Sequence, residues 1–399
     1  MKTKLLLFFV LLLISNLGVF AQTSDTIIGY KFTPGKQLLA SPVKDQANSG
    51  TCWAFAATSF FESEILRMTG QTYDLSEMFF VRNAYNAKAE RFIRFNGSLN
   101  FGQGGQAHDV VNSMKQFGLL TEATYPGILP GEKKHSHAEL ESVLNAMLKS
   151  VASNPGRKLS PVWKKAFNCV VDTYLGEVPA NIEANNSKLT PLEYMRYIGV
   201  NPNDYVEITS YSHHPYYEQF ILEIPDNWQQ DSYYNVPLDE LQTIIDHALD
   251  NGYTVCWDGD VSDKGFSHNK GVAIVPDQDS PDLANSEKLK WEKMTEKDKQ
   301  KLLFSFEGPV KEKLISQEIR QLDFDNHKAT DDHLMHITGW VTDQYNTRYY
   351  CTKNSWNAES NEFGGYLNMS ASYVRLNTIA IMVHKDAIPK SIARKLKIR

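Results

Sequence analysis

The sequence contains little cysteine. Its 399 residues include only four, which are Cys52, Cys169, Cys256 and Cys351. Four cysteines in a chain of this length do not make a disulfide framework, and no two of them have the Cys-x-x-Cys spacing that is typical of a zinc site. We therefore expect free thiols, most of them buried, and we predict no metal and no cofactor.

The sequence also lacks an excess of positive charge. Lys and Arg number 41 against 47 Asp and Glu, and the formal net charge is −6. A general nucleic-acid-binding protein needs a basic surface to face phosphates, so this balance argues against that class. The hydrophobic content of 42% and the charged content of 22% are those of an ordinary globular protein.

Long apolar runs are absent except at the N-terminus. Residues 5–14 read LLLFFVLLLI, two lysines precede them, and Ala21 occupies a typical cleavage position. This pattern predicts a secretory signal peptide over residues 1–21, cut before Gln22. The run is shorter than the ~20 residues that a membrane-spanning helix needs. We therefore predict an exported protein, periplasmic or extracellular, with no membrane contact after cleavage.

The first part of the mature chain has the apolar periodicity of helices. A helix is expected over residues 51–70, with Gly70 as its stop signal. Thr190, Pro191 and Glu193 form a capping-box pattern that opens another helix. Further helices are expected over residues 75–93, 107–118, 137–152, 161–176 and 236–252.

The C-terminal part has a different pattern. Runs rich in Val, Ile, Tyr and Thr predict β-strands. They cover residues 253–261, 334–341, 347–356 and 378–385. A helical part followed by a β-rich part predicts an α+β fold of two lobes with a cleft between them.

The chemistry begins at Cys52, in the first turn of the 51–70 helix. Unpaired backbone N–H groups and the helix dipole stabilise an anion there, so a thiol at this position ionises more easily. A cysteine nucleophile also needs a base and a group that orients the base. His333 opens one β run and Asn354 lies in the next, so a hairpin would set the imidazole beside an amide oxygen that can accept its N–H. Taken alone, a Cys-Trp pair at a helix start is more often there for packing than for catalysis, because free Cys is among the most buried residue types.

Other ionisable residues have simpler interpretations. His336 is interpreted as structural, because strand side chains alternate and positions 333 and 336 face opposite sides. The adjacent His213 and His214 are interpreted as part of a solvated loop, since two histidines without further ligands are weak evidence for a metal. Asp258 and Asp260 flank a strand end and are interpreted as capping or surface residues.

Four short motifs occur in one order along the chain: DQANSGTCWAF, NFGQGG, DHLMHITG and KNSW. Together they resemble the papain-type cysteine peptidases. The resemblance implies a papain-like two-lobe fold and a catalytic triad of Cys52, His333 and Asn354. It also implies that Gln46 donates a hydrogen bond to the oxyanion of the reaction intermediate.

The same resemblance implies a set of substrate-binding residues. Gly104 and Gly105 bind the substrate backbone, Asp332 lies at the start of the histidine strand beside the cleft, and Trp356 shields the imidazole–amide hydrogen bond from water. One position departs from the family pattern, because Asn357 stands where the family has Gly after Asn-Ser-Trp.

The separation of Cys52 from His333 is about twice the ~130–150 residues of simple papain-like enzymes. The order of the motifs places an insertion at about residues 128–250 within a peptidase domain of residues 22–399. Segments such as VVDTYLGEVP and NVPLDELQTIIDHALDNG resemble the bleomycin hydrolase and bacterial aminopeptidase C branch. That branch implies removal of N-terminal residues from peptides, and a homo-oligomer, since related members form rings of six.

The C-terminal segment raises a competing hypothesis. In this branch the C-terminal arm lies in the cleft, and its carboxylate holds the free amine of the substrate. Here Pro389 can open a helix with an apolar stripe of Ile388, Ile392 and Leu396, which leaves little chain to reach the cleft. Aminopeptidase action is the first expectation. The alternatives are an endopeptidase or short-peptide peptidase with an open cleft, acyl transfer to an amine, and a peptide-binding homologue without turnover.

The assignment of the histidines is directly testable. The His333→Ala variant should lose peptide hydrolysis, because the base is removed, whereas His336→Ala should mainly lower stability. Turnover of a fluorogenic peptide and thermal unfolding of both variants check this. The reverse pattern would mean that the strand register is assigned wrongly.

Overall fold

The computed structural model describes residues 29–128, 131–154, 156, 158–184, 186–278 and 291–399. The signal peptide predicted over residues 1–21 lies outside these residues. So does the first part of residues 286–303, whose charged sequence SEKLKWEKMTEKDKQKLL predicts a solvated helix or loop. Within the described part, none of the helices is both long enough and apolar enough to cross a bilayer.

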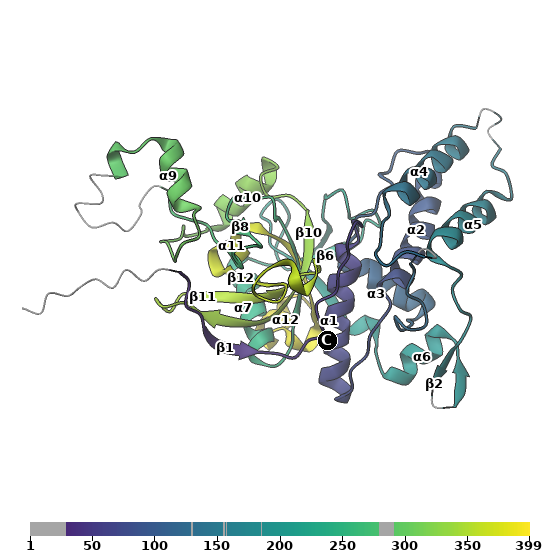
Figure 1. Ribbon diagram of the computed structural model, residues 1–399, viewed down its shortest axis with the longest axis horizontal. Helices are drawn as coiled ribbons and strands as arrows, with labels where there is room; N and C mark the ends of the chain where they lie inside the picture. Colours follow the sequence, from purple (N-terminus) through teal and green to yellow (C-terminus); the bar gives the residue numbers. More distant parts are fainter. Residues whose placement is uncertain (1–28, 129–130, 155, 157, 185, 279–290) are drawn as a thin grey trace, which may run out of the picture.

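One lobe is helical. It contains, in chain order, α1 (Cys52–Thr69), α2 (Glu77–Arg94), α3 (Ala107–Phe117), α4 (Ala138–Ala152), α5 (Trp163–Leu175) and α6 (Pro191–Ile198), with the small hairpin β2 (Ile182–Ala184) and β3 (Ser187–Leu189) beside it (Figure 1). These helices lie within about two residues of the expected ranges, and they share one apolar core. The predicted capping box is confirmed, because Thr190 Oγ1 accepts from Glu193 N and the Glu193 carboxylate accepts from Thr190 N.

The other lobe is built on an 11-stranded sheet with the order β5-β6-β4-β13-β7-β10-β11-β12-β9-β8, to which β1 adds on β10. The central strands confirm the predicted β runs. The strands are β1 (Thr33–Gln37), β4 (Tyr205–Thr209), β5 (Gln219–Ile221), β6 (Ser232–Asn235), β7 (Val255–Gly259), β8 (Phe266–Ser267), β9 (Val272–Ala273), β10 (His333–Thr342), β11 (Arg348–Lys353), β12 (Tyr366–Ser370) and β13 (Thr378–His384).

Short helices complete this lobe. They are α7 (Leu238–Asp250), α9 (Glu296–Leu303), α10 (Gln317–Asp325), α11 (Ala371–Asn377) and α12 (Lys390–Lys395), with single 3-10 turns at η1 (Pro202–Asp204), η2 (Ala358–Ser360) and η3 (Lys385–Ala387). The region predicted as an insertion, about residues 128–250, therefore contributes to both lobes. It adds α4–α6 to the helical lobe and β4–β6 with α7 to the sheet lobe.

Helix α1 lies between the two lobes (Figure 1). Every residue from Cys52 to Ile65 is buried, including the polar ones. Its core contacts include helical-lobe residues on one side and Cys256, Leu334 and Met382 of the sheet on the other. A helix that is buried all round is held in a single position. Its N-terminus, with Cys52, is therefore placed at the junction of the lobes.

The two faces of the sheet carry different cores. On β7 and β10, Cys256 and Leu334 pack toward α1, whereas Trp257 and Met335 pack in a second core with α7. This is the period-two alternation of a strand that is buried on both faces. The predicted C-terminal stripe is confirmed and packs in the second core, where Ile398 also lies. The last helix is thus on the face of the sheet opposite α1.

A group of buried charges lies under the junction of the lobes. Lys44 Nζ is 2.7 Å from Glu77 and 3.5 Å from Glu62, which are both almost fully buried, and 2.7 Å from the exposed Asp74. Burial works against the Lys44 ammonium, but the coulombic attraction of Glu77 and Glu62 outweighs it and raises the pKa of Lys44. Glu62 also accepts a hydrogen bond from Ser41 Oγ.

Lysine 44 should therefore be necessary for stability. Lys44→Met leaves two buried carboxylates without their cation, which should cost about 3–5 kcal/mol. Lys134→Met is the matched control, because Lys134 forms an exposed pair with Asp45 at 3.0 Å and should lose less than about 1 kcal/mol. Urea unfolding of both variants measures the difference, and equal losses would show that the buried pairs add nothing.

Candidate active site

Cys52 is the first residue of α1, and its thiol is nearly buried. The thiol receives a hydrogen bond from the backbone of Leu334 on β10. Burial raises the pKa of the Cys52 thiol to about 12, the Leu334 hydrogen bond opposes this, and the carboxylates of Asp258, Asp331 and Asp226 raise it further. A thiol in this environment needs a base close by before it can act as a nucleophile.

His333 and Asn354 lie side by side at the same junction. Strands β10 and β11 pair antiparallel, as the hairpin argument predicts, and His333 Nε2 is 2.8 Å from Asn354 Oδ1. The amide oxygen only accepts, so the neutral imidazole carries its proton on Nε2 and leaves Nδ1 as a free base. Burial lowers the pKa of His333 to about 4, and the hydrogen bond to Asn354 opposes the shift.

The Asn354 side chain is held from two further directions. Its Oδ1 also accepts from Ser355 N at 2.7 Å, and its Nδ2 donates to His268 Nδ1 at 3.3 Å. His268 Nε2 in turn lies 2.7 Å from Ser360 Oγ. Sequence reasoning missed His268, because the short segment around it contains no motif that would single it out.

Trp356 covers this arrangement. Its ring lies 4.8 Å from the His333 ring and 5.0 Å from the His268 ring, measured between centroids. It therefore lies where the predicted shield of the imidazole–amide hydrogen bond would be. Asn357 follows with φ +75°, a backbone conformation that Gly adopts without strain. This explains why the family has Gly there and why Asn, which tolerates positive φ better than most residues, can replace it.

Gln46 is held beside the same segment. Its backbone N–H donates to Ser355 O at 2.9 Å, its Oε1 accepts from Ser355 Oγ at 2.6 Å, and its Nε2 donates to Ser49 O at 2.8 Å. A side-chain amide has two N–H donors. One of them is thus still able to bind an oxyanion.

The loop with Gly104 and Gly105 forms another wall. Trp53 Nε1 donates to Gln103 O at 2.9 Å, and the buried Lys88 ammonium donates to the carbonyl oxygens of Gly102 and Gly104. A Cβ at Gly104 would overlap the carboxylate of Asp226, so a side chain at this position would require Asp226 to move.

Some of the predicted residues lie apart from this arrangement, or differ from expectation. Among the described residues, no hydrogen bond joins Cys52 to His333. His336 is fully buried and lies 2.8 Å from Ser59 Oγ on α1, in agreement with a structural role. Asp332 is exposed and accepts from Ser262 N at 3.2 Å.

The expectation for Asp258 is wrong. It is 3% exposed and lies within β7, not at the surface. Neither of its carboxylate oxygens has a hydrogen-bond donor among the described residues. Asp260 does cap a loop, because it accepts from Ser262 N at 2.6 Å and Thr330 N at 3.1 Å. The sequence around the end of β7 therefore did not distinguish the buried Asp258 from the loop-capping Asp260.

The expectation for the cysteines holds. All four are free, and Cys52, Cys256 and Cys351 are buried while Cys169 is exposed.

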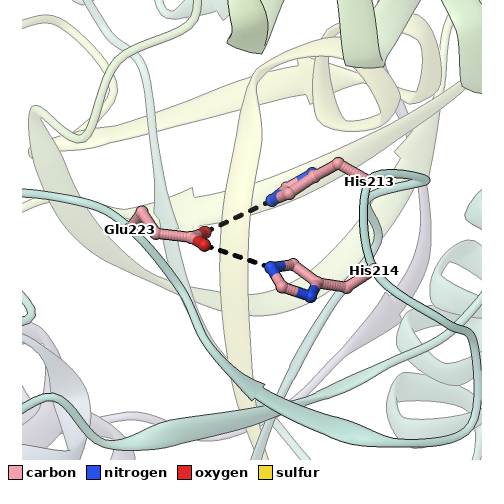
Figure 2. Close-up of side chains that lie close together, drawn as sticks. All are labelled: His213, His214 and Glu223. Carbon is pink, nitrogen blue, oxygen red and sulfur yellow. Dashed lines mark hydrogen bonds and ion pairs between the residues drawn. The ribbon is translucent and has the colours of Figure 1, made fainter.

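A separate set of groups has the chemistry of a metal site. Figure 2 shows His213 and His214 directed at Glu223, with Nε2–carboxylate distances of 3.3 and 3.1 Å. Their ligand atoms lie within 4.8 Å of one another. His213 and Glu223 are exposed, as the loop interpretation predicts, and Gln321 lies 3.0 Å from His213 Nδ1. The carboxylate already pairs with both imidazoles.

Comparisons with known proteins agree with this geometry. The profile of the papain family of cysteine proteases matches residues 32–169, and that of the peptidase C1-like family matches residues 180–293. Aminopeptidase C of Lactococcus lactis subsp. cremoris is 23% identical over 392 residues, covering 88% of this chain and 82% of that protein. Mitochondrial cysteine proteinase 1 of Saccharomyces cerevisiae is 21% identical over 407 residues, covering 89% and 77%.

A solved structure supports the fold. The crystal structure of PepW from Lactobacillus rhamnosis superposes with a TM-score of 0.68 at 17% identity, covering 92% of this chain and 84% of that one. The two-lobe fold and these matches define a cysteine peptidase with the papain fold. The chain is a papain-like cysteine peptidase of the aminopeptidase C and bleomycin hydrolase type.

The hydrogen bond to Asn354 should matter for turnover. In Asn354→Ala the imidazole loses the acceptor that selects its tautomer, so kcat on a peptide substrate should fall by about 100-fold or more. Asn357→Gly is the control in the same loop and should keep normal turnover, because Gly adopts φ +75° readily. Steady-state kinetics of both variants test this, and equal activity of Asn354→Ala and the wild type would reject the orienting role.

Proposed function

We propose that the chain hydrolyses peptide bonds with a Cys52–His333–Asn354 triad and removes N-terminal residues from peptides. The observation that carries the proposal is the 2.8 Å hydrogen bond between His333 and Asn354, at the junction where α1 presents Cys52. The hydrogen bond leaves Nδ1 of His333 free to act as the base.

The first half-reaction forms a thioester. His333 Nδ1 takes the thiol proton as the Cys52 sulfur attacks the carbonyl carbon of the peptide bond. The negative charge that develops on the carbonyl oxygen is stabilised by the backbone N–H of Cys52 and the remaining N–H of Gln46. The C–N bond then breaks as the His333 imidazolium donates its proton to the leaving amine, and the acyl group stays on sulfur.

The second half-reaction releases the acyl group. His333 takes a proton from a water molecule, whose oxygen attacks the thioester carbonyl. The C–S bond breaks, the carboxylic acid product leaves, and the proton returns from His333 to the Cys52 sulfur. No cofactor is needed for either half-reaction, because each proton that His333 accepts is the one that it later donates.

The pKa shifts are consistent with this sequence of steps. Burial favours a neutral thiol and a neutral imidazole in the free enzyme. Transfer of the proton from Cys52 to His333 creates two opposite charges in one step, so their attraction offsets part of the cost of forming each one. The N-terminus of α1 favours the thiolate further.

Trimming from the N-terminus is supported by the long match to aminopeptidase C. It also requires that the cleft be blocked beyond the first substrate residue. In this proposal the block is supplied by the segment around Asp226, between β5 and β6 of the inserted region, because Asp226 lies against Gly104. The C-terminal helix packs in the core on the opposite face of the sheet and does not supply the block in this structure.

The two levels of this proposal can be tested in one experiment. A fluorogenic single-residue amide with a free amine should be hydrolysed faster than its N-acetylated form, and Cys52→Ala should hydrolyse neither. Cys169→Ala is the control, because Cys169 is the exposed free thiol. Preference for the acetylated substrate would reject the aminopeptidase function alone, and activity of Cys52→Ala would reject the cysteine-peptidase mechanism.

A further inference from the structure

Three carboxylates from distant parts of the chain gather near the Cys52 thiol. Asp226 comes from the inserted region, Asp258 from β7, and Asp331 from the turn before β10. All three act electrostatically on Cys52, and each raises the pKa of its thiol. The proposed mechanism uses none of them, and their negative charge opposes formation of the thiolate.

Asp258 is the most unusual of the three. It shares the side of β7 that faces α1, since Cys256, two residues earlier, belongs to the core around that helix. It is almost fully buried, and its carboxylate oxygens accept no hydrogen bond from a protein donor among the described residues. Burial and, after it, the neighbouring Asp331 raise the pKa of Asp258. A buried carboxyl group without a donor or a cation is costly to retain.

Asp331 and Asp226 are only partly buried and complete the group. Gln106, directly after the glycine pair, donates through Nε2 to both oxygens of Asp331 at 3.0 and 2.9 Å. Asp226 lies against Gly104, and it is close enough to Asp331 to raise the pKa of the Asp331 carboxyl group.

Among the described residues, a single cation, Lys88, acts on Asp226 and does not balance three carboxylates. Lys88 attracts Asp226, but its ammonium donates to the carbonyl oxygens of Gly102 and Gly104. A hollow of about 580 Å³ borders Asp331 and is also lined by Pro225 and Thr330. Asp331 is therefore accessible from solvent through this hollow, and Pro225, the neighbour of Asp226, lies on its wall.

We propose that Asp226 and Asp331, with Asp258 behind them, bind the free α-ammonium group of the peptide substrate. This inference rests on the proposed function and names the residues that select the N-terminus. Asp226 and Asp331 both lie at the glycine loop and are near enough to interact electrostatically, so in this proposal one ammonium group binds both. Charge-assisted hydrogen bonds to such a pair are the strong type, and the bound cation balances the excess of negative charge. The amine is thus recognised by the body of the protein, because the C-terminal helix packs on the opposite face of the sheet.

The test uses the full mature chain with alanine 7-amido-4-methylcoumarin and its N-acetylated form. Asp226→Asn and Asp331→Asn should each raise KM for the free-amine substrate by about tenfold or more, since one charge-assisted contact is lost. For the acetylated substrate kcat/KM should stay equal or rise, because a neutral acetyl group gains nothing from the carboxylates. Asp325→Asn is the matched control, as Asp325 is an exposed carboxylate lining the same hollow.

The outcomes separate the inference from the proposed function. If the wild type prefers the free amine but neither Asn variant changes KM, the inference fails and the aminopeptidase function stands. If KM rises equally in Asp325→Asn, the effect comes from the general negative electrostatic field of this region, and the proposed ammonium site is rejected. If the wild type prefers a dipeptide amide with a free amine, and the Asn variants lose that preference, the ammonium site stands and single-residue trimming fails. An N-acetylated arginine substrate provides a further check. If the Asp226→Asn and Asp331→Asn variants lose as much activity on it as on the free-amine substrate, the carboxylates bind a basic side chain of the substrate, and the proposal is overturned.

Discussion

The burial of α1 on all sides is the constraint on which the rest of the structure depends. A helix that packs against helices on one side and a sheet on the other cannot slide or rotate without opening both cores. Its N-terminus is therefore a precise position, and Cys52 occupies it. The residues around the thiol come from the sheet, the glycine loop and the segment before the helix, so each of them is positioned relative to α1.

This placement requires polar groups in the interior. Along the buried part of α1, Lys353 donates to Ser59 Oγ at 2.7 Å and to Ser41 Oγ at 3.0 Å, and Ser41 donates to Glu62. The network joins the sheet, the helix and the N-terminal segment by hydrogen bonds with specific geometry. Apolar packing alone would fix the relative position of the two lobes less precisely than these directional hydrogen bonds do.

The charges beside the cleft, in contrast to those along α1, are not balanced. The charges under α1 are paired, whereas the carboxylates beside the cleft exceed the cations available to them. An excess of like charge in a partly buried place is unfavourable in the free protein and becomes favourable when a cation binds. Under the proposed function, the free amine of the peptide substrate supplies that cation.

Local sequence was sufficient for the helices of the first lobe and the central strands, and it singled out the residues that we propose carry the chemistry. Helical periodicity located α1 to α3, and the capping box at Thr190 identified the start of α6, because these signals lie within a few residues of one another. The residues proposed as nucleophile, base and orienting amide could be singled out because each lies in a short motif and the motifs follow one order. Tertiary structure decided what surrounds them. Asp258 was interpreted as a surface residue, His268 was missed, and Asp226, Asp258 and Asp331 were not associated. The reason is physical: burial and the energy of a charge depend on neighbours across the fold, and for these residues the neighbours are distant in sequence.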